Sequence, residues 1–225
     1  MVAREYNELV SELAFSVDRD TIARKHKDNI LTILGDEESP YVKALKRKCH
    51  NVGILTNEPV IYSGTFKYPY VIDIETYRGV FPTTPRFDTD IDHLFTQGTS
   101  CVAEACEMVL NTLKRTGENV LIVGRGHAVK GLSEALIAED FTVTVCHSRT
   151  ANLYSLLSVA DKIVYTAPEW VNYTYDVLKK DAVIIDVSGA TKEHKYLSGR
   201  TITNIGKLTT SVTTNRVARR RNTWL

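Results

Sequence analysis

Two glycines and an arginine end an apolar run in the middle of the chain. Residues 119–123 are Asn-Val-Leu-Ile-Val, and Gly124, Arg125 and Gly126 follow them directly. Because glycine has no Cβ, the backbone of such a turn can approach a phosphate group closely, and the arginine adds positive charge. A helix after the turn would direct its free N–H groups to the same place. These residues therefore predict a site for the pyrophosphate of a dinucleotide.

A second polar group follows the next predicted strand, residues 142–146. Sites for NAD usually carry an acid there, which accepts the ribose 2′-hydroxyl. This chain has His147, Ser148 and Arg149 instead. A hydroxyl and a guanidinium suit a 2′-phosphate, and Arg125 can join them, so the pattern favours NADP over NAD. The alternative for Arg149 is a solvated loop cation.

The segments around these residues predict a strand-helix-strand unit. Residues 119–123 are typical of a strand buried on both faces, and residues 142–146 are β-branched. Between them, Val129, Leu132 and Leu136 recur at helical spacing. A glycine-rich first turn in such a unit indicates a Rossmann-type parallel sheet that binds a nucleotide. A tight turn that binds no nucleotide is the alternative.

This stretch resembles the methylenetetrahydrofolate dehydrogenase/cyclohydrolase family, the FolD family. The resemblance rests on Val-Gly-Arg-Gly-His-Ala-Val at 123–129 and Val-Cys-His-Ser-Arg-Thr at 145–150. The family pattern is Gly-Arg-Ser, two variable residues and Val-Gly, then Cys-His-Ser-Arg/Lys-Thr after the next strand. Gly126 stands where the family has serine, and Lys130-Gly131-Leu132 replaces its Gly-Lys-Pro.

Two more residues are expected at the cofactor site. Predicted strands at 162–166 and 182–187 bring Thr166 and Gly189 to the edge of the sheet where such a cofactor lies. The candidate NADP-binding residues are Gly124, Arg125, Gly126, His147, Ser148, Arg149, Thr166 and Gly189.

The N-terminal region extends the resemblance. Gly-Asp-Glu-Glu-Ser-Pro-Tyr-Val at 35–42 is similar to the family segment that carries an active-site tyrosine, and Tyr41 matches the tyrosine that flanks the folate ring. The family lysine four residues later corresponds to Leu45, and Lys46 is next to it. One residue turns a helix by about 100°. Lys46 is therefore either an active-site group after a local shift or part of a solvated basic face.

The acidic segment from Asp88 to His93 resembles the family's Asp-Val-Asp-Gly, with Asp92 at the second aspartate. A carboxylate accepts two parallel N–H bonds, so the resemblance implies that Asp92 anchors the pterin. The alternative is an acidic turn. Residues 57–87 are shorter than the family's segment and offer no counterpart of its active-site glutamine, although Phe81–Pro85 is a candidate for its proline-rich loop. Of the family's glycine-rich closing loop, 205–212 keeps only Gly206 clearly.

The whole pattern predicts an α/β protein of two α/β lobes with a cleft between them. Residues 1–98, completed by a C-terminal helix at 210–225, would form the substrate lobe, and residues 99–209 the Rossmann-type NADP-binding domain. The basic segment 216–221 is expected to be a solvated helix end. The other predicted helices are 3–24, 41–50, 99–115, 151–160 and 170–180, and the other predicted strands are 29–34, 52–56, 70–74 and 201–205.

Composition and cysteine spacing limit the expected partners and compartment of the protein. The 225 residues carry 28 Lys and Arg against 27 Asp and Glu, which gives no reason to expect nucleic acid or an anionic membrane as a partner. The sequence has no apolar run long enough to span a bilayer. The cysteines show no Cys-x-x-Cys spacing, which favours free thiols in a reducing cytoplasm. They are Cys49, Cys101, Cys106 and Cys146. The family resemblance further implies a homodimer that binds a tetrahydrofolate derivative.

The leading hypothesis is an NADP-dependent methylenetetrahydrofolate dehydrogenase. Tyr41, Lys46 and Asp92 are its candidate catalytic residues. Loss of the family lysine affects chiefly the cyclohydrolase step, in which water attacks and protons move, so that activity is expected to be weak or absent. The alternatives are a bifunctional enzyme, a nucleotide-binding homologue without catalysis, and a Rossmann reductase for another small substrate.

Overall fold

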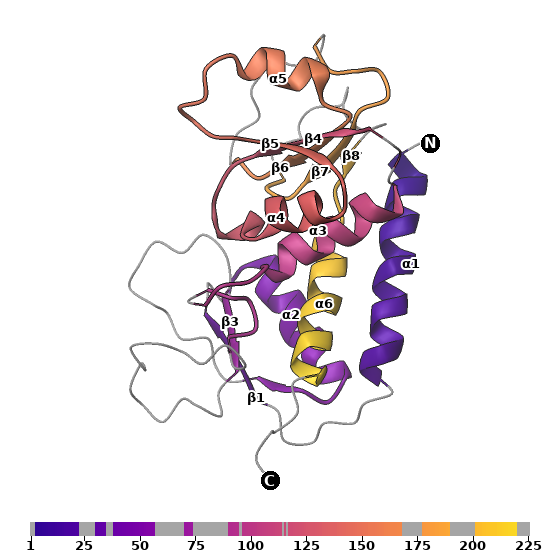
Figure 1. Cartoon of the computed structure of the whole chain (residues 1–225). Helices are drawn as coiled ribbons and strands as arrows, with labels where there is room; N and C mark the ends of the chain where they lie inside the picture. The colour runs from indigo at the N-terminus through magenta and orange to yellow at the C-terminus, as the bar shows by residue number, and fades with distance from the viewer. Residues whose placement is uncertain are drawn as a thin grey trace. The chain divides into compact units, whose positions relative to one another are not determined.

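Two compact units make up the chain, and each is built from two segments of sequence. One contains Met1–Leu13 and Val102–Leu208, and the other contains Ala14–Cys101 and Thr209–Leu225. The structure is a computed structural model (Figure 1). It describes residues 3–22, 30–34, 38–56, 70–73, 90–94, 96–113, 115, 117–167, 177–189 and 201–219.

The first unit is built on a five-stranded parallel sheet (Figure 1). Its strands lie in the order β5-β4-β6-β7-β8, and each neighbouring pair is parallel. The chain therefore winds outwards in both directions from β4, as in doubly wound nucleotide-binding folds. The strands are β4 (Asn119–Val123), β5 (Thr142–Cys146), β6 (Lys162–Tyr165), β7 (Val183–Asp186) and β8 (Thr201–Ile202).

Helices cover both faces of this sheet. Strands β6 and β7 are buried along their whole length, as expected for central parallel strands. On one face, Leu121 and Ile163 pack with Leu157 of α5 (Leu153–Val159). In Figure 1, α4 (Leu132–Ala138) and α3 (Cys101–Thr112) lie on the other side. The predicted α/β class with a Rossmann-type parallel sheet is confirmed.

The second unit contains a three-stranded sheet of order β2-β1-β3. Strand β1 (Ile30–Leu34) pairs in parallel with β2 (Leu55–Thr56) and in antiparallel with β3 (Tyr70–Asp73). Helices α1 (Ala3–Ile22) and α6 (Ile205–Arg219) contribute residues to both units.

Helix α2 (Pro40–Asn51) carries part of the predicted substrate site. Proline occupies its first turn, where a missing N–H costs no intrahelical bond. Val42, Leu45 and Cys49 are buried at helical spacing and fix which face points into the core. The predicted helix is confirmed, and Leu45 belongs to its apolar face.

Some predicted boundaries were wrong. Residues 52–54 close α2 instead of starting a strand, because the Val52 N–H bonds to the Cys49 carbonyl at 3.1 Å and Gly53 adopts φ +79°. Helix α6 begins at Ile205, so the segment expected to match a glycine-rich loop is helical. Residues 177–180 form turns and bends where the end of a helix was expected.

Other predictions fall outside the described residues. The proline-containing segment Phe81–Pro85 and Asp88 are in this group, as are residues 168–176 and 220–225. Within the described part of the chain, no helix combines the length and the apolar character that crossing a membrane requires.

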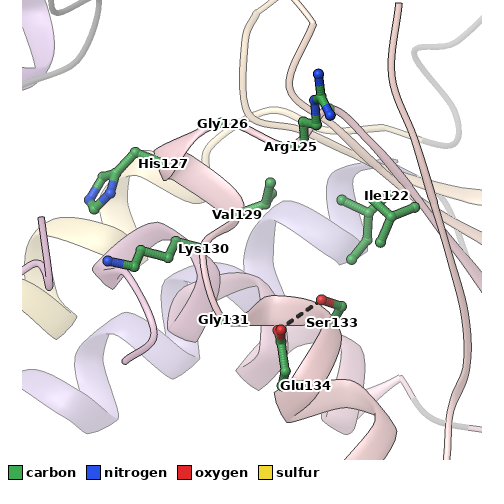
Figure 2. Close-up of a pocket in the computed structure, with 11 residues that line it drawn as sticks. Ile122, Arg125, Gly126, His127, Val129, Lys130, Gly131, Ser133 and Glu134 are labelled. Atoms are coloured by element: carbon green, nitrogen blue, oxygen red, sulfur yellow. Dashed lines mark hydrogen bonds between the residues drawn. The ribbon is translucent and has the colours of Figure 1, made fainter. Parts of the chain in front are cut away.

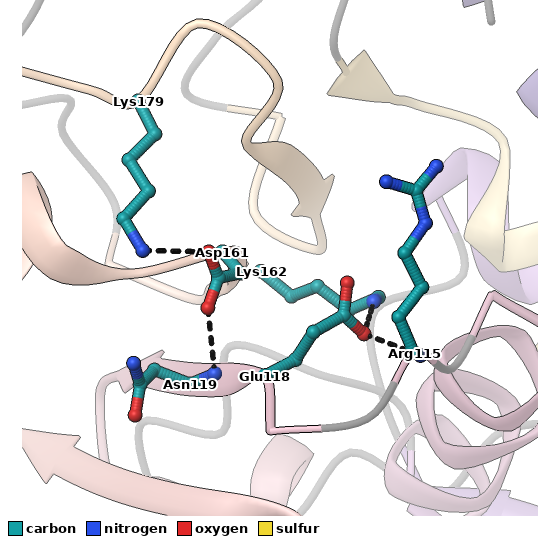
Figure 3. Close-up of polar contacts among 6 residues, drawn as sticks. All are labelled: Arg115, Glu118, Asn119, Asp161, Lys162 and Lys179. Carbon is teal, nitrogen blue, oxygen red and sulfur yellow. Dashed lines mark hydrogen bonds and ion pairs between the residues drawn. The ribbon is translucent and has the colours of Figure 1, made fainter.

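Charged side chains tie together the starts of β4 and β6 (Figure 3). Glu118 pairs with Lys162, and it also accepts the Arg115 N–H at 2.8 Å. Asp161 accepts the Asn119 N–H at 2.8 Å and pairs with Lys179 at 2.6 Å. Burial acts to raise the pKa of Asp161, but the Asn119 N–H and the Lys179 ammonium hold it below its usual value. Both contacts therefore favour an ionised Asp161.

The two ion pairs should differ sharply in their contribution to stability. Lys162 and Glu118 are 2% and 14% exposed, whereas Lys179 and Asp161 are 40% and 28% exposed. Glu118→Gln leaves a buried ammonium unpaired and should lower the free energy of unfolding by about 3–5 kcal/mol. Lys179→Met should cost less than about 1 kcal/mol. Urea denaturation of both variants measures this, and equal losses would contradict the assignment.

Candidate functional site

The glycine turn lies where three parallel strands end. Gly124 follows β4 with φ +121°, and its N–H donates to the Cys146 carbonyl at 2.8 Å. The backbone N–H and the side-chain hydroxyl of Thr166 each donate to the Val123 carbonyl at 2.9 Å. The turn is thus tied to the ends of β5 and β6. This is the edge at which doubly wound sheets bind nucleotides.

Gly124 has no room for a side chain. A Cβ there would lie 2.0 Å from the hydroxyl oxygen of Thr166. Gly126 differs, because its φ is −76° and a Cβ would meet nothing within 4 Å. Gly124 is therefore required by the turn itself, and Gly126 leaves its exposed backbone open to approach by a ligand.

A pocket of about 290 Å³ opens beside this turn (Figure 2). In Figure 2, Arg125 extends from one side of the turn, and His127 and Lys130 extend from the other. Of the predicted cofactor-binding residues, Gly124, Arg125 and Gly126 line the pocket. Its other lining residues are Ile122, His127, Val129, Lys130, Gly131, Ser133, Glu134 and Val145.

Glu134 gives this pocket an acid that sequence reasoning missed. Its carboxylate accepts the Ser133 hydroxyl at 2.8 Å. Its own backbone N–H and that hydroxyl lower the pKa of Glu134, so the group is ionised at neutral pH. An acid was sought only at the end of the second strand, whereas Glu134 comes from the first turn of α4. The pocket therefore contains a group that can accept a hydrogen bond from a ligand hydroxyl, in addition to basic groups that can attract an anion.

The α-helix after the turn begins later than expected. A 3₁₀ turn (His127–Val129) comes first, and Gly131 then adopts φ +77°. Helix α4 starts only at Leu132 and has seven residues. The prediction of a helix directly beyond the glycine turn was wrong, because the left-handed Gly131 separates the two helical segments. The exposed backbone of the turn and its basic side chains remain as the groups that can meet a phosphate.

A compact turn follows β5. The His147 N–H donates to the Thr150 hydroxyl at 2.9 Å, and the Arg149 N–H donates to His147 Nδ1 at 3.1 Å. The His147 ring thus serves as an acceptor that shapes the turn. The side chains of Ser148 and Arg149 are exposed. None of these residues lines the pocket, so their contact with a cofactor stays a prediction.

The last two predicted cofactor residues lie at the same edge of the sheet. Thr166 braces Val123, as described above. Gly189 follows β7 with φ +77°, and its N–H donates to the buried carboxylate of Asp186 at 2.8 Å. The Ser188 hydroxyl donates to the same oxygen at 3.1 Å. Asp186 therefore holds the turn that carries Gly189.

In the second unit, Tyr41 is partly exposed as a residue, but its phenol is buried. The phenol bonds to the Thr213 side chain. Burial raises the pKa of Tyr41 well above its usual value, and the nearby Cys101 and Asp92 act in the same direction. Tyr41 is therefore a neutral phenol at physiological pH.

Asp92 is buried at 6% exposure and has a structural partner. Its carboxylate accepts the N–H of Cys101, the first residue of α3, at 2.7 Å. A carboxylate at this position satisfies a free N–H of the helix and suits the positive end of its dipole. Asp92 thus caps α3, and its contact with a pterin stays a prediction.

Hydrogen bonds within the acidic segment around Asp92 hold its conformation. Asp90 is fully buried and accepts the backbone N–H groups of Leu94 and Thr96 at 2.8 and 2.9 Å. His93 adopts φ +51° and its Nδ1 lies 2.9 Å from the Thr96 hydroxyl. Among the residues that the structure describes, no group of His, Cys, Asp and Glu has the arrangement of a metal site.

The remaining catalytic candidate, Lys46, lies on α2 and is partly exposed. Leu45, at the position of the family lysine, is 0% exposed. Arg216 was predicted to be solvated, which was wrong: it is partly buried and donates to the carbonyls of Ile91 at 3.0 Å and Thr99 at 2.7 Å. Sequence spacing gave no signal for these contacts, because Arg216 is far from both carbonyls along the chain.

Comparison with known proteins agrees with this geometry. The family described as tetrahydrofolate dehydrogenase/cyclohydrolase, NAD(P)-binding domain, matches residues 100–217, more than half of the chain. The chain belongs to this family. The match spans the glycine turn, the pocket and the parallel sheet, and it confirms the predicted FolD-family resemblance.

Relatives extend the similarity towards the N-terminus. The bifunctional protein FolD of Paracidovorax citrulli is 30% identical over 160 residues, which cover 66% of this chain and 56% of that protein. The one from Rickettsia bellii is 29% identical over 220 residues, with 80% and 77% covered. The chain spans little more than half the length of the curated relative from Paracidovorax citrulli.

Solved structures share the fold. The FolD dehydrogenase/cyclohydrolase of Campylobacter jejuni has a TM-score of 0.65 and 16% identity, with 96% of each chain covered. The enzyme of Thermoplasma acidophilum has a TM-score of 0.64 and 19% identity, with 98% of this chain and 97% of that chain covered. At such identities the likeness establishes the architecture of the chain.

The two glycines of the turn provide a matched pair of substitutions. Gly124→Ala forces a strained backbone and a clash with Thr166, and should lower the free energy of unfolding by about 2–4 kcal/mol. Gly126→Ala has open space and should change it by less than about 0.5 kcal/mol. Thermal and urea denaturation measure both, and a destabilised Gly126→Ala protein would contradict the described turn.

Proposed function

We propose that the protein is an NADP-dependent 5,10-methylenetetrahydrofolate dehydrogenase of one-carbon metabolism. The observation that carries the proposal is the pocket beside Gly124 and Gly126, at the end of β4 in a doubly wound sheet. In this reaction a hydride leaves the one-carbon bridge between two folate nitrogens, whose lone pairs stabilise the resulting cation. Bound NADP supplies the hydride acceptor. The protein's task is to position the reactants rather than to supply a strong acid or base.

The charges at the turn support NADP as the cofactor. Arg125 lines the pocket, and Ser148 and Arg149 are exposed at the end of β5. A guanidinium makes paired hydrogen bonds to phosphate, and a hydroxyl adds another donor. A solved relative from Trypanosoma brucei, with a TM-score of 0.63, is described as complexed with NADP. Gly124, Gly126, His147, Thr166 and Gly189 complete the proposed cofactor contacts, chiefly through backbone groups.

Two residues of the second unit are proposed to contact the folate. Tyr41 would pack its ring against the folate. Its phenol is buried and neutral, so proton exchange with a substrate is not the role that we propose for it. Asp92 would anchor the pterin. A carboxylate has two oxygens with several acceptor positions, so capping α3 through one oxygen is compatible with accepting a ligand N–H.

The cyclohydrolase activity is proposed to be weak or absent. Its water-attack step needs a group that moves protons, and the family lysine is replaced by the fully buried Leu45. A second candidate is a bifunctional enzyme in which Lys46 takes this role. The relatives described as bifunctional favour it, and so does the partial exposure of Lys46 on the same helix.

The cellular setting is likewise a proposal. The cysteines of the described residues form no disulfide and are buried, and burial raises the pKa of Cys49 and Cys106 to about 12 and that of Cys146 to about 11. Thiols of this kind suit a reducing compartment and react slowly. We therefore place the protein in the cytoplasm, and we propose a homodimer, which light scattering would test.

The cofactor proposal predicts a selective effect of Arg149. The native protein should reduce NADP in the presence of methylenetetrahydrofolate more efficiently than NAD. Arg149→Met should weaken NADP binding about tenfold or more and leave NAD binding within about twofold, because only NADP carries the 2′-phosphate. Calorimetric titration with each dinucleotide measures this. Equal losses for both would remove Arg149 from the 2′-phosphate site, and no binding of either would refute the proposed function.

The two candidate functions differ in the role of Lys46. If the protein is a dehydrogenase alone, native protein should hydrolyse methenyltetrahydrofolate no faster than the uncatalysed background. In a bifunctional enzyme, Lys46→Met should lower that hydrolysis by about a hundredfold or more. Lys43→Met is the matched control, since Lys43 lies on the same helix and pairs with Glu38 in solvent. Rapid hydrolysis that Lys46→Met abolishes would favour the bifunctional enzyme.

A further inference from the structure

Helix α6 is polar and yet buried. Most of its described residues in the second unit have little contact with solvent, although they carry hydroxyl or amide groups. These buried polar residues are Thr209, Thr210, Ser211, Thr213, Thr214 and Asn215. Buried hydroxyls need hydrogen-bond partners, and threonine in a helix commonly finds one in the carbonyl of the preceding turn.

Two neighbouring threonines show what sets one hydroxyl apart. Thr214 donates within the helix, to the carbonyls of Thr210 at 3.1 Å and Ser211 at 3.0 Å. Thr213 also donates within the helix, to the Thr209 carbonyl at 2.9 Å, and in addition it bonds to the phenol of Tyr41. Thr213 thus links α6 to the predicted folate-flanking residue.

Thr213 takes part in two hydrogen bonds. Its hydroxyl donates to the Thr209 carbonyl of its own helix, and its side chain also bonds to the phenol of Tyr41. A hydroxyl can both donate and accept, so one threonine can serve both partners. Tyr41 is thereby connected through Thr213 to the backbone of α6.

A tether at the phenol oxygen restrains the whole tyrosine ring. The side chain has two rotatable bonds between the backbone and the ring, and both angles are restricted when the backbone is helical and the oxygen is held. Tyr41 lies in the first turn of α2, and part of the residue is still exposed. The arrangement therefore restricts the orientation of a ring that belongs to a partly exposed residue.

We propose that Thr213 is a positioning residue, which orients the Tyr41 ring for packing against the folate through the hydrogen bond at its far end. This inference rests on the proposed function, because it assumes that a folate is the ring's partner. Thr213 does not touch the substrate in this proposal. Its effect is to spare the ligand the entropic cost of ordering the ring on binding.

The first test compares folate binding in matched variants. Thr213→Val removes the hydroxyl but keeps the shape, and should weaken tetrahydrofolate binding and raise its KM roughly three- to tenfold, the equivalent of one hydrogen bond. Thr213→Ser keeps the hydroxyl and should restore native affinity. Thr214→Val is the control, since it removes a buried hydroxyl of the same helix that has no bond to Tyr41. Fluorescence titration with tetrahydrofolate and steady-state kinetics provide the readouts.

A double-mutant cycle makes the test independent of folding losses. Tyr41→Phe should weaken binding as much as Thr213→Val does, and the double variant should be no weaker than Tyr41→Phe alone. The proposal is overturned if Thr213→Val and Thr214→Val weaken binding equally, or if the two losses at Tyr41 and Thr213 simply add. Non-additive losses of thermal stability without any change in affinity would also overturn it, because they show a structural bond only.

The outcome separates this inference from the proposed function. If the native protein neither binds tetrahydrofolate nor forms NADPH, the proposed function fails and the positioning role fails with it. If the native protein does both and Thr213→Val retains native affinity, only the inference about Thr213 fails.

Discussion

The carbonyl oxygen of Val123 is the point on which the nucleotide-binding edge depends. It accepts both the backbone N–H and the hydroxyl of Thr166, while the next residue, Gly124, donates to the end of β5. Three strands are thereby joined at their carboxyl ends, at the place where the sheet order reverses. The hydroxyl of Thr166 occupies the space that a side chain at Gly124 would need. The bond therefore both requires glycine at this position and fixes the path by which the chain enters the pocket.

The elements of this unit could be predicted from the sequence because their signals are local. Apolar runs such as residues 119–123 identify buried parallel strands. The positive φ of Gly124 is a backbone conformation that glycine adopts without strain. The helix start could not be placed from periodicity. Val129 and Leu132 are both buried and in phase, but the left-handed Gly131 between them breaks the helix into two parts. Periodicity reports which side chains are inside, and it does not report how the backbone between them is paired.

In the second unit, hydrogen bonds between segments that are distant in sequence could not be predicted. Asp92 was identified by its likeness to a ligand-binding carboxylate, but its partner in the structure is the first N–H of α3. Arg216 has the sequence context of a solvated helix end, yet it binds two carbonyls of the loop that carries Asp92. These bonds connect segments that are remote in sequence, so no spacing rule identifies them. The buried carboxylate of Asp92 and the partly buried guanidinium of Arg216 both need partners, and here those partners include backbone groups.

The same buried bonds bear on how a substrate site can be built in this unit. A carboxylate that caps a helix and a phenol that is tethered to another helix lose freedom before any ligand arrives, and this lowers the entropic cost of binding. Such groups are suited to holding a ligand still and poorly suited to exchanging protons with it, because burial keeps Tyr41 neutral. At the position of the family lysine, the same helix carries Leu45, which is fully buried and cannot ionise. Hydride transfer from a carbon flanked by two nitrogens depends on placement, whereas hydrolysis of the product depends on proton movement. This contrast between placement and proton movement is the physical ground on which we propose a dehydrogenase with weak or absent cyclohydrolase activity.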